Sequence, residues 1–485
     1  MDRCSDLARN QTGRNPTKHI GLSMHNCAPS RWDGTPFGYN PQEHTFQSGR
    51  ETRLRWLREF MSLPNYLRAM LIVDLICSFG TGLVMPIELL FTTHSLGASM
   101  SEATLTVTVS SIASLIGNPI IGWLSDKRSP WIAMHIALAF SIVGPIIFAV
   151  STSFPMALGA AFVSGLGMSM MTAWTSILTL ITDEKQHSIV YGINQAELNL
   201  GIGLGAAVGG LIAAAGSDLF YRAGFAARGI GFAFVSLALL LLERHYHLRR
   251  LTRQNMAQVQ EIQVPQVKSS FSPDTATNSS FMRKVVLTMT LLAIGTLFMD
   301  IFGYSQFDSG LVTTLISDPQ IPRWSLSVVD VVNTFAVVIM NVILLPRLKD
   351  GNHVVMLRTV PIFWALAWVL IDLALAFDST PVVLSIASFG IIVFGLGEVM
   401  LGISQPVVAA RLAGPRYSGR MFGLLNTAQS MGYILGPLFA SFVLDGREFI
   451  PLLSACAIGL IVVALPWFCC ISSKLPGERT AEHED

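Results

Sequence analysis

The sequence predicts an all-α membrane protein with twelve transmembrane helices arranged as two parallel six-helix halves. Three observations predict this fold. The 485-residue chain is 51% apolar and only 13% charged, whereas soluble domains carry about 25% charged residues. Its apolar residues gather in twelve segments, each close to or above the roughly 20 residues that a bilayer core requires. Finally, spaced glycines recur in equivalent segments of the two halves.

The first half, residues 65–243, contains six apolar segments that each predict one helix. They are residues 67–93, 101–124, 130–151, 154–182, 189–215 and 223–243. Short polar turns separate them. Pro130 suits the first turn of the third helix, because the fixed φ of proline is already helical. The preceding residues 1–64 predict a polar tail outside the membrane.

The second half, residues 284–472, contains the other six apolar segments. They are residues 284–315, 324–346, 353–377, 381–411, 420–444 and 448–472. Residues 244–283 separate the halves and are polar, with serine, threonine and proline, a composition that is typical of a linker. Residues 473–485 form a second polar tail.

A glycine pattern repeats between the halves. Gly165, Gly167 and Met170 recur as Gly395, Gly397 and Met400 at an offset of 230 residues, and Gly192, Gly201 and Gly205 recur as Gly423, Gly432 and Gly436 at an offset of 231 residues. Two consecutive segments whose offsets agree within one residue indicate a duplication. Because each half has an even number of helices, both halves should have the same orientation in the membrane.

Lysine and arginine are unequally distributed between the two sets of short loops. One set holds Lys127, Arg128, Lys185, Arg347, Lys349, Arg411, Arg416 and Arg420, and the opposite set holds Arg222, Arg323 and Arg447. Cytoplasmic loops are enriched in these residues. We therefore expect the first set, both terminal tails and the 244–283 linker to be cytoplasmic, in a protein of the plasma (inner) membrane.

This orientation predicts that two glycosylation sequons stay unmodified. Asn10 and Asn278 each begin an Asn-X-Ser/Thr sequence, but both lie in segments predicted to be cytoplasmic, where N-glycans are not added. After expression in a eukaryotic host, glycosidase treatment should leave the electrophoretic mobility unchanged. A glycan on either asparagine would contradict the orientation.

The segment NLGIGLGAAVGG, residues 199–210, favours helix packing over nucleotide binding. A dinucleotide-binding loop needs G-x-G-x-x-G spacing after a strand, but Ala206 occupies the last glycine position and the glycines lie inside an apolar run. Gly201, Gly205 and Gly209 instead recur every four residues, with Gly210 beside them. Such small-residue faces let membrane helices approach closely.

Other function classes lack support in the sequence. The net charge of +1 excludes a generally basic nucleic-acid-binding protein, and the six cysteines show no metal-ligand or disulfide spacing. We predict no cofactor and no metal. A membrane enzyme would need clustered nucleophiles, bases or metal ligands, and His135 stands isolated on the third predicted helix.

Several motifs resemble the major facilitator superfamily. The glycines at 201, 205, 209 and 210 match the fifth-helix motif of its proton-driven exporters, with Ala206 where the family has proline. GWLSDKRSP matches the family's loop between helices 2 and 3, and RYSGRMFG resembles its loop before helix 11. The conformational residues implied by this resemblance are Gly122, Asp126, Lys127, Gly201, Gly205, Gly209, Gly210, Arg416, Arg420, Gly436 and Pro437.

The resemblance covers residues 65–472, and FGTGLVMPIELLF (79–91) and YSQFDSG (304–310) extend it to helices 1 and 7. It implies the major facilitator fold, in a small-molecule or drug-exporter-like branch. It also implies a central cavity lined by helices 1, 4, 7 and 10. The loop between helices 2 and 3 departs from the pattern, since Ser129 and Pro130 stand where a glycine and a basic residue are expected.

Four carboxylates on the implied cavity helices are candidates for proton coupling. They are Glu398, Asp74, Asp300 and Glu88, and none has an evident lysine or arginine partner within the membrane. An unpaired carboxylate in a low-dielectric medium is costly to ionise, so each should stay protonated until water or a cation reaches it. Amphipathic candidates for the substrate cavity are Trp174, Thr175, Tyr304, Gln306 and Gln405.

The sequence thus predicts a monomeric secondary transporter that exports a small organic compound by proton antiport. Its partners would be the small-molecule substrate, protons and the lipid bilayer. Proton-coupled uptake of a nutrient or metabolite is the alternative within the same fold, because function depends on the site rather than on the fold. A membrane receptor or scaffold that transports nothing is the alternative from another class.

Overall fold

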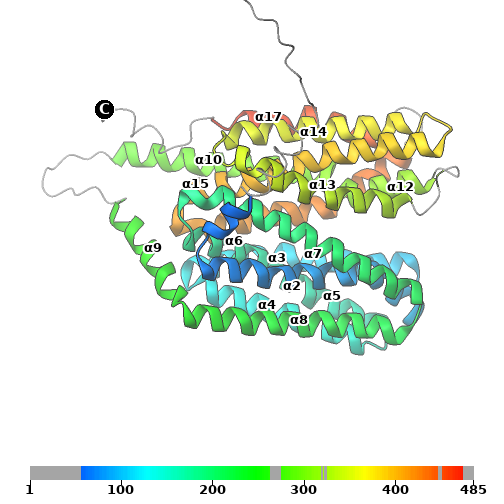
Figure 1. Ribbon diagram of the computed structural model, residues 1–485, viewed down its shortest axis with the longest axis horizontal. Coiled ribbons are helices and arrows are strands. Elements are labelled where there is room, and N and C mark those ends of the chain that lie inside the picture. The colour runs from blue at the N-terminus through cyan, green and yellow to red at the C-terminus, as the bar shows by residue number, and fades with distance from the viewer. Residues whose placement is uncertain (1–55, 263–274, 318–320, 322–324, 446–450, 473–485) are drawn as a thin grey trace, which may run out of the picture. The chain divides into compact units, whose positions relative to one another are not determined.

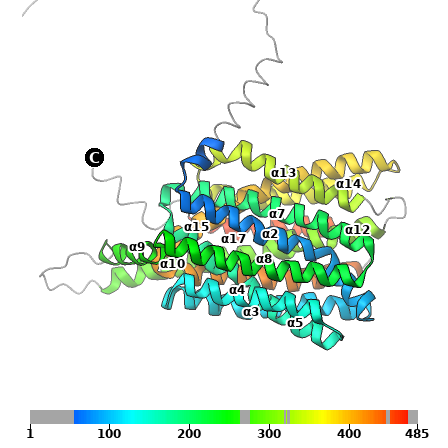
Figure 2. The same ribbon diagram turned by 60° about the horizontal axis from the view of Figure 1, so that its bottom comes forward.

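The computed structural model describes residues 56–262, 275–317, 321, 325–445 and 451–472. Every regular element in this part of the chain is helical (Figures 1 and 2). The prediction of an all-α protein is confirmed for these residues.

The first half begins with α2 (Asn65–Leu90), which continues into the π-helix η1 (Phe91–Ser95). The following helices are α3 (Met100–Lys127), α4 (Pro130–Val150), α5 (Phe154–Met168), α6 (Met170–Ile181), the short η2 (Glu184–Gln186), α7 (His187–Ala215) and α8 (Asp218–His245). Local signals start and end them. Ser99 and Glu102 form a reciprocal capping box at α3, which satisfies its first free amides. Gly216 ends α7 in a left-handed conformation with φ of 62°.

The second half begins with α10 (Thr275–Met299), the π-helix η3 (Asp300–Tyr304), α11 (Ser305–Asp308) and α12 (Gly310–Ser317). The remaining helices are α13 (Ser325–Leu348), α14 (His353–Ala374), α15 (Thr380–Asp445), α16 (Leu452–Gly459), η4 (Leu460–Ala464) and α17 (Leu465–Cys469). A single predicted span can therefore consist of several consecutive helical pieces.

Eleven helices among the described residues are long and apolar enough to cross a membrane. One of them, the 66-residue α15, joins two helices across a kink at Gly414, where φ is 57°. Only glycine adopts that region at little cost. Two predicted spans, 381–411 and 420–444, lie on either side of this kink. The number twelve rests on counting α15 as two spans.

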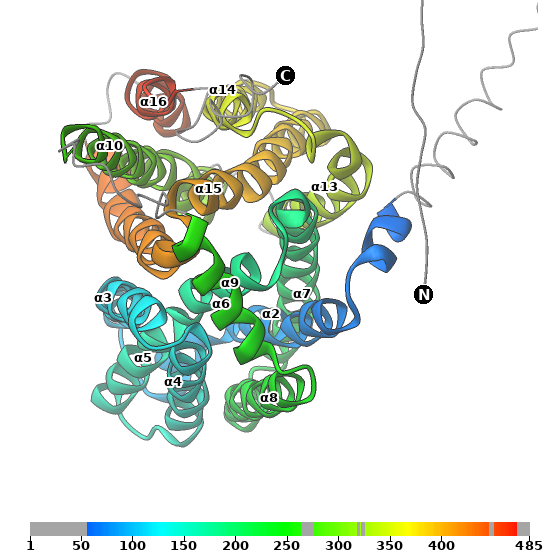
Figure 3. The same ribbon diagram turned by 90° about the vertical axis from the view of Figure 1, so that its left-hand side faces the viewer.

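The 244–283 segment, expected to be a linker, contains a helix of its own. α9 (Leu248–Ile262) follows α8 after a sharp turn at His247, whose φ of 52° is left-handed. α9 contacts α6 and α8 of the first half and α15 of the second. Figure 3 shows it crossing the end of the helix bundle.

The two halves form separate groups of helices that meet along a few long contacts. α3 packs on α15, α7 packs on α13, and α6 also contacts α15 (Figure 3). One buried apolar cluster crosses this boundary, because Val399, Ile403 and Val407 of α15 pack with residues of the first half. Glu398 and Asp126, two of the polar residues described next, lie along the same boundary.

The sequence repeat corresponds to a repeat in packing. A Cβ on Gly201 would overlap Ser78 of α2, and a Cβ on the equivalent Gly432 would overlap Asp300 of η3. The same equivalence holds for Gly205, which packs on Phe79 of α2, and Gly436, which packs on Ser305 of α11. Close glycine contacts thus join the first helix to the fifth in one half and the seventh to the eleventh in the other, as a duplicated fold requires.

Candidate functional site

Glu398 lies on α15 at the boundary between the halves. Its carboxylate accepts hydrogen bonds from Gln195 Nε2 of α7, at 3.2 Å, and from Asn333 Nδ2 of α13, at 3.3 Å. Asn199 of α7 is a third hydrogen-bonding neighbour. The side chain is 5% exposed. Glu398 is therefore bound by amides from both halves rather than by a cation.

Asp74 and Glu197 form a second acidic cluster, between α2 and α7. Asn194 Nδ2 donates to Asp74 Oδ2 at 3.0 Å and to Glu197 Oε1 at 2.7 Å, and the two carboxyl groups are themselves hydrogen-bonding neighbours. A hydrogen bond between two carboxyl groups requires that one of them carry a proton. This cluster can therefore hold a proton within the first half alone.

Asp300 begins the π-helix η3 and is 2% exposed. Its Cβ faces Gly432 of α15, where any larger residue would overlap it. No basic side chain in the described part of the chain pairs with Asp300, Asp74 or Glu398. Single-turn π-helices often occur at functional positions, and this one presents a buried acid.

Glu88 differs from the other three candidate acids because a basic side chain lies near it. Arg228 of α8 attracts the Glu88 carboxylate electrostatically, and Thr106 of α3 is its hydrogen-bonding neighbour. The aliphatic part of Arg228 lies beside Gly80 of α2. Because an opposite charge offsets the cost of burying a carboxylate, Glu88 is the weakest of the four acids as a site for a mobile proton.

Four of the five predicted cavity residues are engaged within the protein. Trp174 is 1% exposed and donates to Asn194 Oδ1. Gln306 is 0% exposed and donates to two backbone carbonyls, those of Ile301 and Gly436. These two side chains bind neighbouring groups and expose almost no surface. Thr175 donates to a carbonyl of its own helix, and Gln405 donates to Thr296 Oγ1 at 2.7 Å.

Tyr304 is the predicted cavity residue with the most ring neighbours. Its ring meets that of Trp364 edge to face, with centroids 4.7 Å apart, and that of Phe394 at 6.1 Å. The side chain is half-buried. It therefore combines an aromatic surface with access from outside the core, which suits contact with an organic ligand.

Asp126 at the end of α3 joins the two halves. Its carboxylate accepts hydrogen bonds from the backbone amides of Gly419, at 2.7 Å, and Arg420, at 3.0 Å, in α15. The Arg420 guanidinium lies 3.6 Å away. Gly122 permits this approach, since a Cβ there would overlap the Gly419 carbonyl. By contrast, Lys127 and Arg416 are exposed and stack on the neighbouring rings of Trp123 and Tyr417.

Further polar contacts between the halves lie near Asp126. Ser176 and Ser418 are 2.8 Å apart, Asn426 donates to Thr172 at 2.9 Å, and Arg411 pairs with Glu184 at 3.1 Å. They continue inward to Ser114 and Ser430, 3.0 Å apart. All these residues lie in the half of the bundle next to the α3–α4 turn. Several hydrogen bonds and an ion pair near the Asp126 carboxylate therefore connect the two halves at this end of the bundle.

Replacing Asp126 by alanine is expected to open this end of the bundle. A hydrogen bond to a charged group contributes about 1.5–3 kcal/mol, so losing two of them should raise the open population about tenfold or more. The readout is the alkylation rate of a cysteine placed at Ser418, which is 0% exposed, with the native cysteines replaced by serine. Asp218→Ala removes an acid that pairs only within its own half and serves as the control. An unchanged rate in Asp126→Ala would contradict this role.

The α7 glycines divide into two groups. Gly201, Gly205 and Gly209 are buried against α2, and a Cβ on Gly205 or Gly209 would overlap the carbonyl oxygen of Phe79 or Leu83. Gly210 is exposed and has no atom within 4 Å of a Cβ. The expectation that Gly210 belongs to the packing face is therefore wrong. Pro437 is likewise exposed, next to Gly436, which packs on Ser305.

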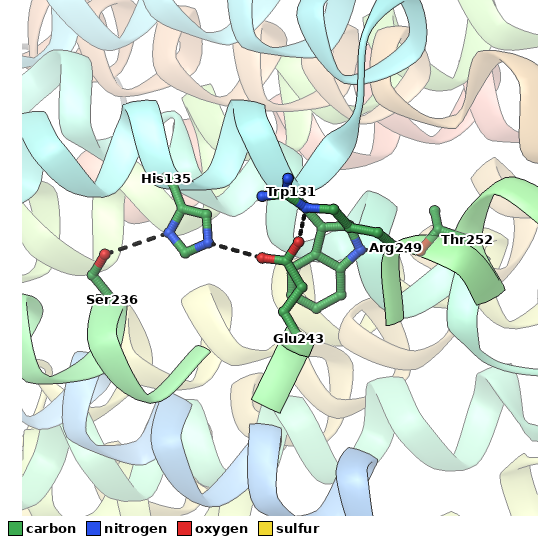
Figure 4. A network of polar contacts seen from close by, with 6 residues as sticks. All are labelled: Trp131, His135, Ser236, Glu243, Arg249 and Thr252. Atoms are coloured by element: carbon green, nitrogen blue, oxygen red, sulfur yellow. Dashed lines mark hydrogen bonds and ion pairs between the residues drawn. The ribbon is translucent and has the colours of Figure 1, made fainter. Parts of the chain in front are cut away.

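His135 is not isolated, contrary to the expectation from the sequence. Its Nε2 lies 3.3 Å from Glu243 Oε2, and its Nδ1 lies 3.4 Å from Ser236 Oγ. Arg249 of α9 pairs with the other Glu243 oxygen (Figure 4). The network is a structural connection between α4, α8 and α9. Within the described residues, no cluster of three metal-ligating side chains occurs.

The amides that bind the acids are the functional residues that sequence reasoning missed. Asn194, Gln195 and Asn199 lie in the stretch INQAELN of α7, and Asn333 lies in α13. The three α7 amides and Glu197 place four polar side chains within two turns of an otherwise apolar segment, which is costly in lipid. That cost is a signal which could have identified this stretch as part of the site.

Comparison with known proteins supports one family. A sequence profile of the Major Facilitator Superfamily matches residues 70–437. The quinolone resistance protein NorA of Staphylococcus aureus is 29% identical over 163 residues, which cover 33% of this chain and 41% of NorA. The chain thus matches less than half of that relative's length. The uncharacterized MFS-type transporter YttB of Bacillus subtilis is 23% identical over 391 residues, which cover 79% of this chain and 89% of YttB.

Solved structures share the arrangement of helices. The human organic anion transporter MFSD10 (TETRAN) has a TM-score of 0.57 at 15% identity, with 84% of this chain and 100% of that chain covered. The proton:xylose symporter XylE has a TM-score of 0.61 at 13% identity, with 84% and 96% covered. At these identities the likeness shows the fold alone. Because the profile covers most of the chain and its apolar helices can cross the membrane repeatedly, this protein belongs to the major facilitator superfamily and is an integral, multi-pass membrane transporter.

Proposed function

We propose that the protein exports a small organic compound, a drug or a metabolite, in exchange for protons. It works as a monomeric secondary transporter of the plasma membrane, with both termini and α9 on the cytoplasmic side. The two halves rock against each other and expose the central site alternately to either side of the membrane. The loop charges of the sequence support this orientation.

The main support for proton exchange comes from the hydrogen bonds of Glu398. The carboxylate receives amide hydrogen bonds from α7 in one half and α13 in the other, with no basic partner among the described residues. A relative movement of the halves must change these bonds, so the cost of ionising Glu398 differs between the two conformations. By linkage, binding or release of a proton then shifts the conformational equilibrium.

Alternating access also requires contacts that close one side of the transporter, and the contacts of Asp126 are of this kind. With the proposed orientation they lie on the cytoplasmic side, where they favour a conformation closed to the cytoplasm. Export needs this conformation to take up external protons and release the compound outside. The Asp74–Glu197 cluster and Asp300 lie on the helices that correspond to each other in the two halves, and they provide further acids for the coupling.

The direction of transport rests on the partial similarity to NorA, whose name refers to quinolone resistance. Resistance to a drug is a consequence of its export. We therefore assign export to this chain, with a fluoroquinolone and the organic cation ethidium as the first test compounds.

Purified protein in liposomes tests the proposal. With the interior acidic, antiport should concentrate ethidium inside the vesicles above its equilibrium level, and with the interior alkaline it should not. Uptake by symport predicts accumulation with the opposite gradient. Equal ethidium levels with both gradients, and the same result for a panel of fluoroquinolones, would instead favour a membrane receptor or scaffold.

A further inference from the structure

The turn between α8 and α9 carries a group of arginines that the transport cycle does not use. Arg244 lies at the end of α8, and Arg249, Arg250 and Arg253 lie on the first turns of α9. We call these four residues the basic corner. All four are exposed. Arg250 and Arg253 face outward because the opposite side of α9 is bound to the protein.

Three contacts fix the inner face of α9. Thr252 Oγ1 accepts a hydrogen bond from Trp131 Nε1 at 3.0 Å (Figure 4). Leu248 is 0% exposed, and Asn255 Nδ2 donates to the Leu180 carbonyl at 2.7 Å. These residues follow each other at intervals of three or four along the helix. Arg250 and Arg253 fall between them and must therefore point away from the bundle, whereas Arg249 reaches back to the buried Glu243.

The turn itself leaves Arg244 and the arginines of α9 only a few residues apart along the chain. His247, with φ of 52°, is the only described residue other than glycine that has a positive φ. A residue of this kind in the left-handed region costs free energy and persists only where the surroundings determine it. The sharp turn places Arg244 close in the chain to Arg249 and Arg250 without an intervening loop.

One acid within the described residues pairs with the basic corner, and it neutralises Arg249 alone. Glu243 is the one nearby carboxylate between Asp218 and Ile262 within the described side chains, and its side chain is 3% exposed. It is already paired with Arg249 and lies next to His135. Arg244, Arg250 and Arg253 form no ion pair within the described residues. Three exposed guanidinium groups are therefore available to an anionic partner.

The depth of the basic corner indicates which anion it meets. The apolar helix Asp218–His245 has the length and composition of a membrane span, and Arg244 is its second-last residue. The corner thus lies at the level of the lipid headgroups on the side of α9. Arginine binds phosphate with two parallel hydrogen bonds, and basic residues beside a membrane span attract anionic lipids.

We propose that the basic corner binds the phosphate groups of anionic lipids. A bound headgroup holds α9 and the end of α8 together, and α9 also contacts α15 of the other half. Lipid composition would therefore act on the contact between the halves. Enrichment of loops in positive charge explains that arginines occur here, but it does not require three of them to be exposed without an ion pair at the end of a membrane span.

Native mass spectrometry of the full-length protein tests the proposal. In mild detergent the protein is titrated with phosphatidylserine or with phosphatidylcholine, and the first lipid-binding constants are compared. The wild type should prefer phosphatidylserine. Combining Arg244→Gln, Arg250→Gln and Arg253→Gln should reduce the preference by about fivefold per arginine. The corresponding Arg→Lys variant keeps the charges and should retain most of it.

A matched variant removes three exposed basic residues elsewhere. Lys185→Gln, Arg283→Gln and Arg347→Gln lower the net charge equally and lie outside the basic corner. This variant should keep the wild-type preference for phosphatidylserine. Soluble glycerophosphoserine at the same concentration should not compete with phosphatidylserine, because it lacks the acyl chains.

Two results would overturn the assignment. One is an unchanged lipid preference in the triple glutamine variant while the protein remains folded by size-exclusion chromatography. The other is an equal loss of preference in the matched variant, which would indicate a general charge effect. Competition by the soluble headgroup would contradict a lipid as the ligand and indicate a free phosphate compound.

Discussion

Glu398→Gln is expected to abolish transport driven by a pH gradient while ligand binding survives. The amide keeps the size of the side chain, and rotation lets it still bond to Gln195 and Asn333, but it cannot take up or release a proton. For one-for-one exchange, each pH unit across the membrane supports about tenfold accumulation. The variant should show no accumulation, and ethidium uptake into proteoliposomes with an acidic interior measures this directly.

The pH dependence of binding separates coupling from structure. Because proton and ligand binding are reciprocally linked, Glu398→Gln should bind ethidium with an affinity that depends less on pH than that of the wild type. Asp74→Asn and Asp300→Asn serve as comparison variants. If Glu398→Gln accumulated ethidium as the wild type does, Glu398 would be a neutral structural acid, and Asp74 or Asp300 would become the coupling residue.

Gly205→Leu is expected to prevent correct packing of α2 on α7. A Cβ at this position overlaps the Phe79 carbonyl oxygen and lies 2.8 Å from the Leu83 amide nitrogen. Backbone atoms cannot move aside as a side-chain end can. Overpacking typically costs about 1–3 kcal/mol, and a whole leucine side chain between two helix backbones should cost at least the upper part of that range. The yield of monodisperse protein in size-exclusion chromatography should fall, together with transport.

Gly210→Leu is the matched control, because it introduces the same side chain on the same helix only five residues away. Gly210 is exposed and meets no atom within 4 Å, so this variant should fold and transport like the wild type. Equal yields of the Gly205 and Gly210 variants would show that α2 and α7 do not depend on this contact.

The sequence predicts the helices well because hydropathy depends on local composition. The apolar segments correspond to the helices, and the glycine repeat corresponds to equivalent contacts in both halves. The boundaries differ where backbone geometry intervenes. His247, in a left-handed conformation, precedes a helix within the segment expected to be a linker, whereas the kink at Gly414 lies in the gap predicted between residues 411 and 420.

The site is less predictable because its bonds join residues that are distant in sequence. Glu398 could be selected as a buried acid, but its partner Gln195 is 203 positions away. Glu88 was expected to be unpaired because Arg228 lies inside an apolar segment on another helix. His135 likewise meets Glu243 across 108 positions. Such pairs depend on which helix faces meet, and periodicity alone does not determine that.

Substrate-driven proton movement is the most direct test of proton-coupled export. Proteoliposomes containing the pH-sensitive dye pyranine are loaded with ethidium and diluted into ethidium-free buffer without a pH gradient. Proton-coupled export predicts that outflow of ethidium drives protons inward and acidifies the interior. Vesicles with Glu398→Gln should lose ethidium without acidification. Alkalinisation of the interior during wild-type outflow would indicate symport. Wild-type outflow without any pH change would contradict proton coupling altogether.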